Sequence, residues 1–196
     1  MFANIPPVTR ALILISIVVF LAEQVIAGPL LQLFALWPPG ALFQPWQVIT
    51  YAFLHASWTH LLFNMFALWM FGSVLERYWG SRRYLLYYGA CVLAAAAVQI
   101  TVQSFERSDV PTLGASGGIF GLLLAFAVNF PRQRIMLLFP PIPMPAWFFV
   151  PAYGLVELFL GVTGSASGVA HFAHLGGMLG GAVVMLYWRR GSNSRT

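Results

Sequence analysis

The sequence is poor in charge and in cysteine. Only 8% of its 196 residues are charged, it contains no lysine, and the single cysteine, Cys91, excludes an intramolecular disulfide. A soluble domain is about 45 to 50% apolar, whereas 60% of this chain is hydrophobic. Such a composition excludes both an ordinary water-soluble fold and intrinsic disorder. The aromatic share of 16% is typical of proteins whose Trp and Tyr lie at bilayer interfaces, and we interpret the chain as a membrane protein.

Apolar runs long enough to cross a bilayer recur along the chain. A transmembrane helix needs roughly 20 mostly apolar residues. We identify six candidate runs, at about residues 11–27, 57–74, 84–103, 115–130, 145–162 and 169–188. We therefore expect an all-α membrane protein, a bundle of six transmembrane helices. It would form a single domain over residues 1–196, with a cytoplasmic stub at about 1–10 and a polar cytoplasmic tail at 189–196.

The arginines indicate the orientation of these helices. They precede the first run or follow the second, fourth and sixth runs, and Arg107 is the one exception. Positively charged loops stay on the cytoplasmic side of a membrane. Both termini are therefore expected in the cytoplasm, and the second, fourth and sixth helices begin at the outer face. Because the arginines do not form one stripe, nucleic acid is not an expected partner.

All four histidines lie in two short stretches at the starts of predicted helices. His55 and His60 belong to the second helix, and His171 and His174 to the sixth. His60 and Asn64 share one helical face because they are four residues apart, and both can donate hydrogen bonds. A single histidine can be a packing residue, but an ionisable residue within a membrane span is by default a functional candidate.

A serine flanked by glycines begins the fourth predicted helix, in Gly114-Ala-Ser116-Gly117. Alone this is a weak match to a nucleophile motif, because a serine at a helix start is most often an N-cap. The Gly-x-x-x-Gly spacings at 117–121, 176–180 and 177–181 predict close packing of the fourth helix against the sixth.

These polar residues are expected to meet at one depth. Ser116, His174 and the pair His60 and Asn64 all lie near the outer ends of their helices. A serine whose proton is taken by an imidazole is an activated nucleophile, and side-chain donors aimed at the developing oxyanion complete an acyl-transfer site.

No acid is expected beside the histidine. The only aspartate, Asp109, lies in a loop, and the carboxylates within the predicted spans are Glu23 and Glu157. A Ser-His dyad is therefore favoured over a Ser-His-Asp triad. The chain lacks the His-Glu-x-x-His motif of zinc proteases and the two intramembrane aspartates of aspartyl proteases. We expect neither a metal nor a cofactor.

At these residues the sequence resembles the rhomboid family of intramembrane serine proteases. The family pattern of His-x-x-x-Asn, Gly-x-Ser-Gly and Ala-His-x-x-Gly appears here in order, on the second, fourth and sixth helices. The resemblance implies that Ser116 is the nucleophile and His174 the general base. It also implies that His60, Asn64 and the Ser116 backbone N–H form the oxyanion hole.

The resemblance extends to supporting residues. It implies that Phe120 packs on the catalytic imidazole, that Gly114 and Gly117 support the serine, and that His171 is not the base. The turn at residues 76–83 and the Pro-rich linker at 140–145 resemble the bacterial branch of the family, which implies a bacterial plasma membrane.

The first outer loop departs from the family pattern. It carries Trp46-Gln47 where the family usually has Trp-Arg. The same loop has a run of apolar residues at 30–37, which favours either contact with the lipid interface or packing against the bundle.

The resemblance implies an endopeptidase that cleaves transmembrane segments of other membrane proteins near the outer face of the bilayer. Its partners would be these substrates and the lipid bilayer. The alternative is a non-catalytic rhomboid-like protein that binds transmembrane helices, although such proteins typically lack the serine or the histidine. A channel or transporter would need a polar path through both leaflets, whereas the polar cluster here is confined to the outer half. The sequence leaves the substrate and the oligomeric state open.

Overall fold

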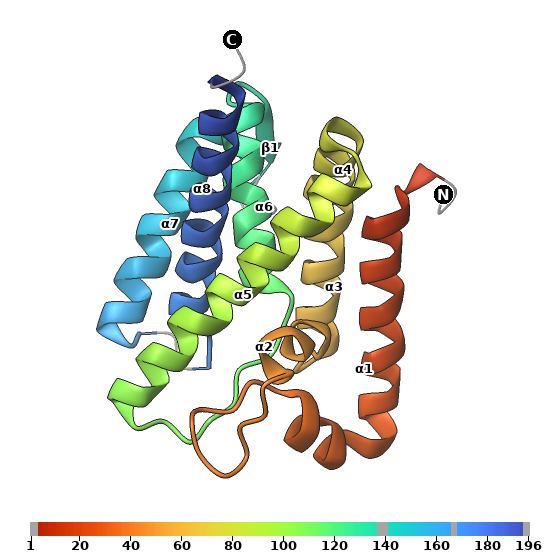
Figure 1. Ribbon diagram of the computed structural model, residues 1–196, viewed down its shortest axis with the longest axis vertical. Helices are drawn as coiled ribbons and strands as arrows, with labels where there is room; N and C mark the ends of the chain where they lie inside the picture. The colour runs from red at the N-terminus through yellow and green to blue at the C-terminus, as the bar shows by residue number, and fades with distance from the viewer. Residues whose placement is uncertain (1–3, 137–140, 166–167, 194–196) are drawn as a thin grey trace.

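The computed structural model describes residues 4–136, 141–165 and 168–193 of the protein (Figure 1). The α-helices are α1 (Pro7–Phe34), α2 (Gln47–Thr50), α3 (Trp58–Ala67), α4 (Ser73–Trp79), α5 (Ser81–Glu106), α6 (Ser116–Asn129), α7 (Ala146–Thr163) and α8 (His171–Asn193). A short 3-10 helix, η2 (Tyr51–Phe53), follows α2, and a π-helical turn, η3 (Leu68–Gly72), joins α3 to α4 in one continuous span. Strands β1 (Arg134–Met136) and β2 (Pro143–Pro145) pair antiparallel.

The predicted helical membrane bundle is confirmed, and each of the six apolar runs corresponds to a helix or to the joined α3–α4 span. The predicted helix ends are less accurate. Helix α1 continues beyond residue 27 to Phe34, through a kink at Ile26 and past Pro29, so most of the apolar run expected in a loop is helical. The expected polar tail is helical as far as Asn193, and its last three residues lie outside the described part of the chain.

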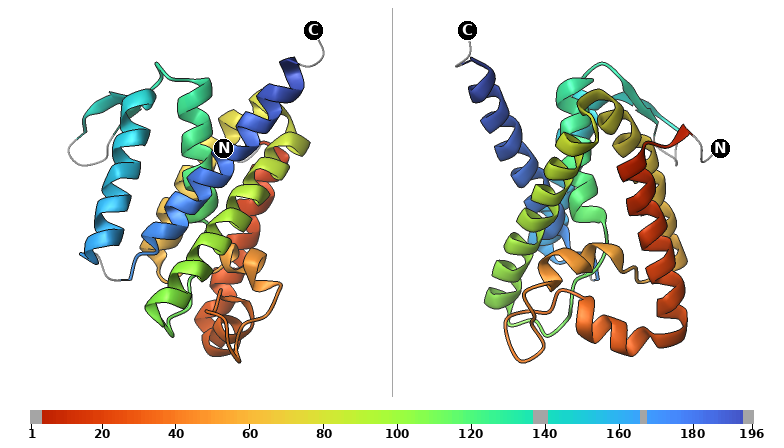
Figure 2. Two further views of the ribbon diagram at one scale, coloured as in Figure 1. Left: turned by 60° about the vertical axis from the view of Figure 1, so that its left-hand side comes forward. Right: turned by 45° about the vertical axis from the view of Figure 1, so that its right-hand side comes forward.

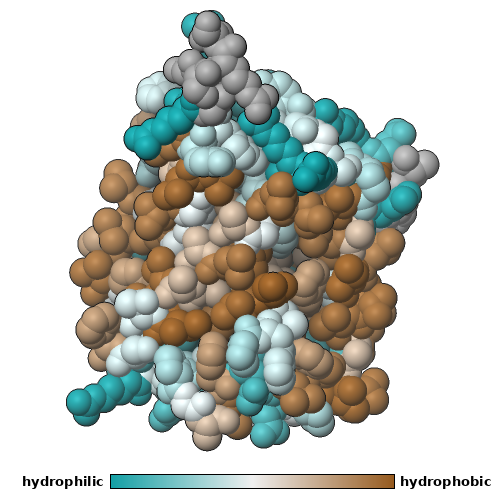
Figure 3. Space-filling view, viewed as in Figure 1, coloured by the Kyte–Doolittle hydropathy of each residue, from teal (hydrophilic) through white to brown (hydrophobic). Residues whose placement is uncertain are grey.

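Helix α6 is too short to cross a bilayer. Among the described residues, four helical spans have the length and apolarity of membrane spans, namely α1, the α3–α4 span, α5 and α7. Helix α6 has 14 residues, which corresponds to roughly 21 Å, against roughly 30 Å for the hydrocarbon core. Figure 3 shows a hydrophobic belt across one face of the molecule, with polar residues gathered at both ends. One end of α6 therefore lies inside the bundle.

Helix α8 packs closely against two neighbours, α5 and α6 (Figure 2). A Cβ at Gly177 would collide with the Gly117 carbonyl oxygen, so the backbones of α8 and α6 touch, as the glycine spacing predicts. The prediction is wrong for Gly176, Gly180 and Gly181. A Cβ at these residues would meet α5 instead, at Val98, Ala94 and Tyr87 respectively.

The eight described arginines that follow the orientation rule gather at one end of the bundle. The start of α1, the α4–α5 turn, β1 and the end of α8 lie together there (Figure 1). Glu76 links the start of α1 to the α4–α5 turn. Its carboxylate accepts hydrogen bonds from the backbone N–H groups of Val8 and Thr9, at 2.9 and 2.7 Å, and from the Ser81 hydroxyl at 2.6 Å. Arg195 lies outside the described residues.

Gln47 anchors the long connection between α1 and α3. Its side chain is fully buried. The amide nitrogen, Nε2, donates to the carbonyl oxygens of Gln32, Leu33 and Leu42, and Oε1 accepts from the backbone N–H of Gln44. A neutral amide therefore organises the loop where the family resemblance leads one to expect an arginine.

Candidate active site

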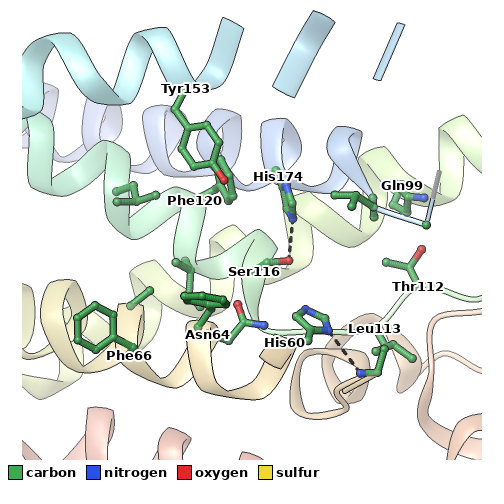
Figure 4. Close-up of a pocket in the computed structure, with 18 of the residues that line it drawn as sticks. His60, Asn64, Phe66, Gln99, Thr112, Leu113, Ser116, Phe120, Tyr153 and His174 are labelled. Carbon is green, nitrogen blue, oxygen red and sulfur yellow. Dashed lines mark hydrogen bonds between the residues drawn. The ribbon is translucent and has the colours of Figure 1, made fainter. Parts of the chain in front are cut away.

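A groove of about 1220 Å³ opens beside the start of α6. Figure 4 shows His60 and Asn64 of α3 on one side of it, Ser116 and Phe120 of α6 at its centre, and His174 of α8 and Tyr153 of α7 on the other side. Apolar residues of α3, η3 and α7 extend the lining between those helices: Phe63, Phe66, Met70 and Phe149. The groove thus joins a polar centre to an apolar rim.

Ser116 is the first residue of α6 and forms the polar centre with His174. The helix N-cap is Ala115, and no side chain caps it. The hydroxyl of Ser116 is therefore free of the capping role and instead lies 2.8 Å from Nε2 of His174. Close approach of α6 and α8 at Gly117 and Gly177 makes this contact possible. The hydroxyl is half-buried and faces the groove.

Phe120 fixes the plane of the His174 ring. One helical turn after Ser116, it stacks on the imidazole with ring centroids 4.2 Å apart and an interplanar angle of 6°. Its other neighbour is Tyr153 of α7, at 5.0 Å between centroids. Phe120 therefore lies between the His174 ring and Tyr153.

Glu157 lies behind His174, on the side away from the serine. Its Oε2 is 2.8 Å from Nδ1 of His174 and 2.6 Å from Nδ1 of His171. The expectation that no acid accompanies the histidine is therefore wrong. Sequence reasoning misses the contact because hydropathy does not fix which face of α7 points inward, but a signal is present: a carboxylate within an apolar span needs a partner.

His60 is held as a hydrogen-bond donor towards the groove. The Ala56 backbone N–H donates to its Nδ1 at 3.4 Å, so the proton of the neutral ring lies on Nε2. Gly114 faces this edge of the ring. It has a φ of +122°, and a Cβ there would clash with Cε1 and Nε2 of His60. Only glycine combines this backbone conformation with so close an approach.

Asn64 offers a second donor. It lies one turn after His60 on α3 and lines the same groove. Its Nδ2 is buried and has no hydrogen-bond partner among the residues that the structure describes. An unpaired buried amide costs about 1 to 3 kcal/mol, so an acceptor supplied by a bound molecule would relieve a real penalty.

His55 packs against the ring of His60. The two rings meet edge to face, with centroids 5.1 Å apart. The His55 backbone N–H donates to Glu23 of α1 at 3.2 Å, which links α1 to the loop before α3. Burial, with a smaller contribution from His60, lowers the pKa of His55 to about 4, so its ring is neutral at neutral pH.

Comparison with known proteins identifies the family. A model described as the rhomboid domain matches residues 42–191. "Rhomboid protein 1, mitochondrial" of Saccharomyces cerevisiae is 32% identical over 149 residues, which cover 71% of this chain and 41% of that protein. "Rhomboid protease GluP" of Bacillus subtilis is 34% identical over 136 residues, covering 69% of this chain and 24% of the relative. "Rhomboid protease GlpG" of Klebsiella pneumoniae is 27% identical over 125 residues, which cover 63% of this chain and 43% of that protein. The chain thus spans less than half the length of each relative.

Proposed function

Because this chain belongs to the rhomboid family, we propose that it is an intramembrane serine endopeptidase that cleaves transmembrane segments of other membrane proteins. The observation that carries the proposal is the 2.8 Å contact between Ser116 Oγ and His174 Nε2 within a groove that also holds two side-chain donors. The names of two relatives, GluP and GlpG, describe them as rhomboid proteases.

Ser116 and His174 would carry out the acyl transfer. As the Ser116 oxygen bonds to the substrate carbonyl carbon, its proton passes to Nε2 of His174. The carbonyl oxygen becomes an oxyanion, and the protonated imidazole then gives its proton to the leaving amine. Water attacks the acyl-enzyme in the same way, with His174 again as the base, and releases Ser116.

The developing oxyanion would be stabilised by His60, Asn64 and the Ser116 backbone N–H. Both side chains present N–H groups to the groove, and the Ser116 N–H is one of the first four in α6, which have no acceptor within the helix. Donors fixed in advance within a site of low polarity contribute more to the rate than the same groups would in water.

We further propose that the protein lies in a bacterial plasma membrane with both termini in the cytoplasm. The gathering of eight arginines at the end of the bundle opposite the groove's polar centre supports this orientation. The site would then open towards the outer face, and the substrate would reach it through the apolar rim between α3 and α7.

The proposal is tested by cleavage of a model transmembrane substrate in liposomes by purified enzyme. Ser116→Ala and His174→Ala should each abolish cleavage, because neither residue can replace the other. Ser73→Ala is the matched control: Ser73 is buried in α4 and does not line the groove. Normal cleavage by the Ser116→Ala variant would overturn the proposal.

A further inference from the structure

Glu157 is a buried carboxylate within a membrane-spanning helix, where an unpaired charge is very costly. It lies in the apolar helix α7 and is only 3% exposed. A charge at such a position is costly and persists where it has a specific role. Its Oε2 has two hydrogen-bond partners on α8, Nδ1 of His171 and Nδ1 of His174.

This arrangement fixes the protonation of His174. An ionised carboxylate only accepts hydrogen bonds, so Nδ1 of each ring must carry the proton that it donates. Nε2 of neutral His174 is then a lone pair, and it lies 2.8 Å from the Ser116 hydroxyl. This is the form of the ring that can accept the proton of the serine. If the proton lay on Nε2 instead, the ring could not act as the base.

His171 holds the carboxylate in place. Its Nε2 is buried with no hydrogen-bond partner within the part of the chain that the structure describes. Its Nδ1 donates the second hydrogen bond to Oε2, at 2.6 Å, and this contact holds the carboxylate beside His174.

The spacing of the three groups indicates hydrogen bonds rather than a metal site. Two ligands about 2.0 to 2.2 Å from a tetrahedral zinc ion lie roughly 3.3 Å from each other. The two nitrogen–oxygen distances here are 2.6 and 2.8 Å, which leaves no room for an ion between the ligand atoms.

We propose that Glu157 is a positioning residue that orients His174, keeps its Nδ1 protonated and stabilises the imidazolium that forms when Ser116 loses its proton. The inference rests on the proposed function of Ser116 and His174. During the reaction the Nδ1 proton stays on His174, hydrogen-bonded to Glu157, and only the Nε2 proton moves between Ser116, the ring and the leaving amine. Phe120 holds the plane of the ring, and Glu157 holds its rotation within that plane.

The test compares Glu157→Gln with the wild-type enzyme in liposomes. The amide carries no charge and can donate to Nδ1, which favours the inactive form of the ring. We expect kcat to fall on the order of 10²-fold or more with little change in KM. The carboxylate favours the protonated ring, so its removal should also move the rising limb of the pH–activity curve to lower pH. Ser116, Glu157, His171 and His60 are the titratable groups that face His174, and Tyr153 of α7 faces Glu157. The variant changes only Glu157.

Glu76→Gln is the matched control. Glu76 is also a buried carboxylate, but it ties α1 to α4 at the other end of the bundle. We expect it to lower the unfolding temperature while the kcat of the folded enzyme and its pH–activity curve stay unchanged. If Glu157→Gln fails to fold, Glu157→Asp takes its place: it keeps the charge, so a pH–activity curve displaced from the wild-type position in folded Glu157→Asp would overturn the inference.

Wild-type turnover and an unshifted pH–activity curve in folded Glu157→Gln would overturn the inference. So would an unchanged curve with lowered activity, because a residue with only a structural role lowers the amount of active enzyme without moving the curve. In both cases an inactive Ser116→Ala variant would leave the proposed function intact. Activity in Ser116→Ala would instead overturn the proposed function itself.

Discussion

At the scale of single residues, the site depends on which nitrogen of each polar side chain carries a proton. Nδ1 of His60 accepts from the Ala56 backbone N–H, and Nδ1 of His174 donates to Glu157. The two histidines therefore present opposite chemistry to the groove: His60 offers an N–H and His174 offers a lone pair. Neither assignment follows from the sequence, since both depend on contacts made by neighbouring atoms in the fold.

Asn64 provides a prediction at this scale. Replacing it by alanine removes a buried donor that would stabilise the oxyanion, so kcat should fall on the order of 10²-fold with little change in KM. Steady-state cleavage in liposomes measures both constants. Asn129→Ala, which removes the same amide from the far end of α6, where it bonds to the Ala125 carbonyl, should leave kcat unchanged. An equal effect of the two substitutions would contradict an oxyanion role for Asn64.

At the scale of elements, the position of the serine depends on the contact between α6 and α8. The carbonyl of Gly117, the residue after Ser116, lies directly against Gly177 of α8. The same contact brings His174, one turn earlier on α8, to the serine. Any side chain at Gly177 would have to push apart two backbones, which cannot yield as a flexible side chain can.

Gly177→Ala should therefore destabilise the protein by about 3 kcal/mol or more and reduce cleavage by the folded fraction, because it separates Ser116 from His174. Thermal unfolding in detergent measures the first effect. Gly89→Ala is the matched control: Gly89 lies in α5, and a Cβ added there would meet no atom within 4 Å, so alanine should be neutral or stabilising by up to about 1 kcal/mol. Equal stability of the two variants would argue against the close α6–α8 contact.

The sequence is sufficient to predict the helices and the common depth of the serine, the histidines and the asparagine, because long apolar runs and motif positions determine both. The sequence does not predict how each helix is rotated about its own axis, and therefore which side chains face the interior. Helix α7 is apolar on nearly all sides, so no periodic pattern shows that Glu157 faces inward. The extension of α1 to Phe34 escapes prediction for a related reason: a helix can continue beyond the apolar run that crosses the bilayer.

At the scale of the whole molecule, the short helix α6 determines where in the bilayer cleavage would occur. The helix begins at Ser116, and its first turn lies within the bundle rather than at the bundle's end (Figure 1). A substrate helix keeps its carbonyls hydrogen-bonded in the bilayer. It must therefore unwind locally to present a peptide bond to the serine, and glycine or proline near its outer end lowers that cost.

We accordingly expect cleavage to depend on the depth of the weak helical segment. A model substrate with a Gly-rich stretch at the outer end of its span should be cut in liposomes by the purified enzyme. A substrate of the same composition with that stretch at the inner end should be cut far more slowly, because its weak helical segment does not reach the depth of the serine. Equal cleavage of both at the relocated stretch would contradict the depth of the site and the orientation inferred from the arginines.

The most direct test of the central claim is covalent labelling of the nucleophile. A fluorophosphonate reacts with a serine only when a neighbouring base activates it. Incubation of the purified protein with this probe, followed by peptide mapping in a mass spectrometer, should find the adduct on Ser116. The adduct should be absent in Ser116→Ala and formed far more slowly in His174→Ala. Labelling of a different serine, or undiminished labelling of the Ser116→Ala variant, would contradict the account.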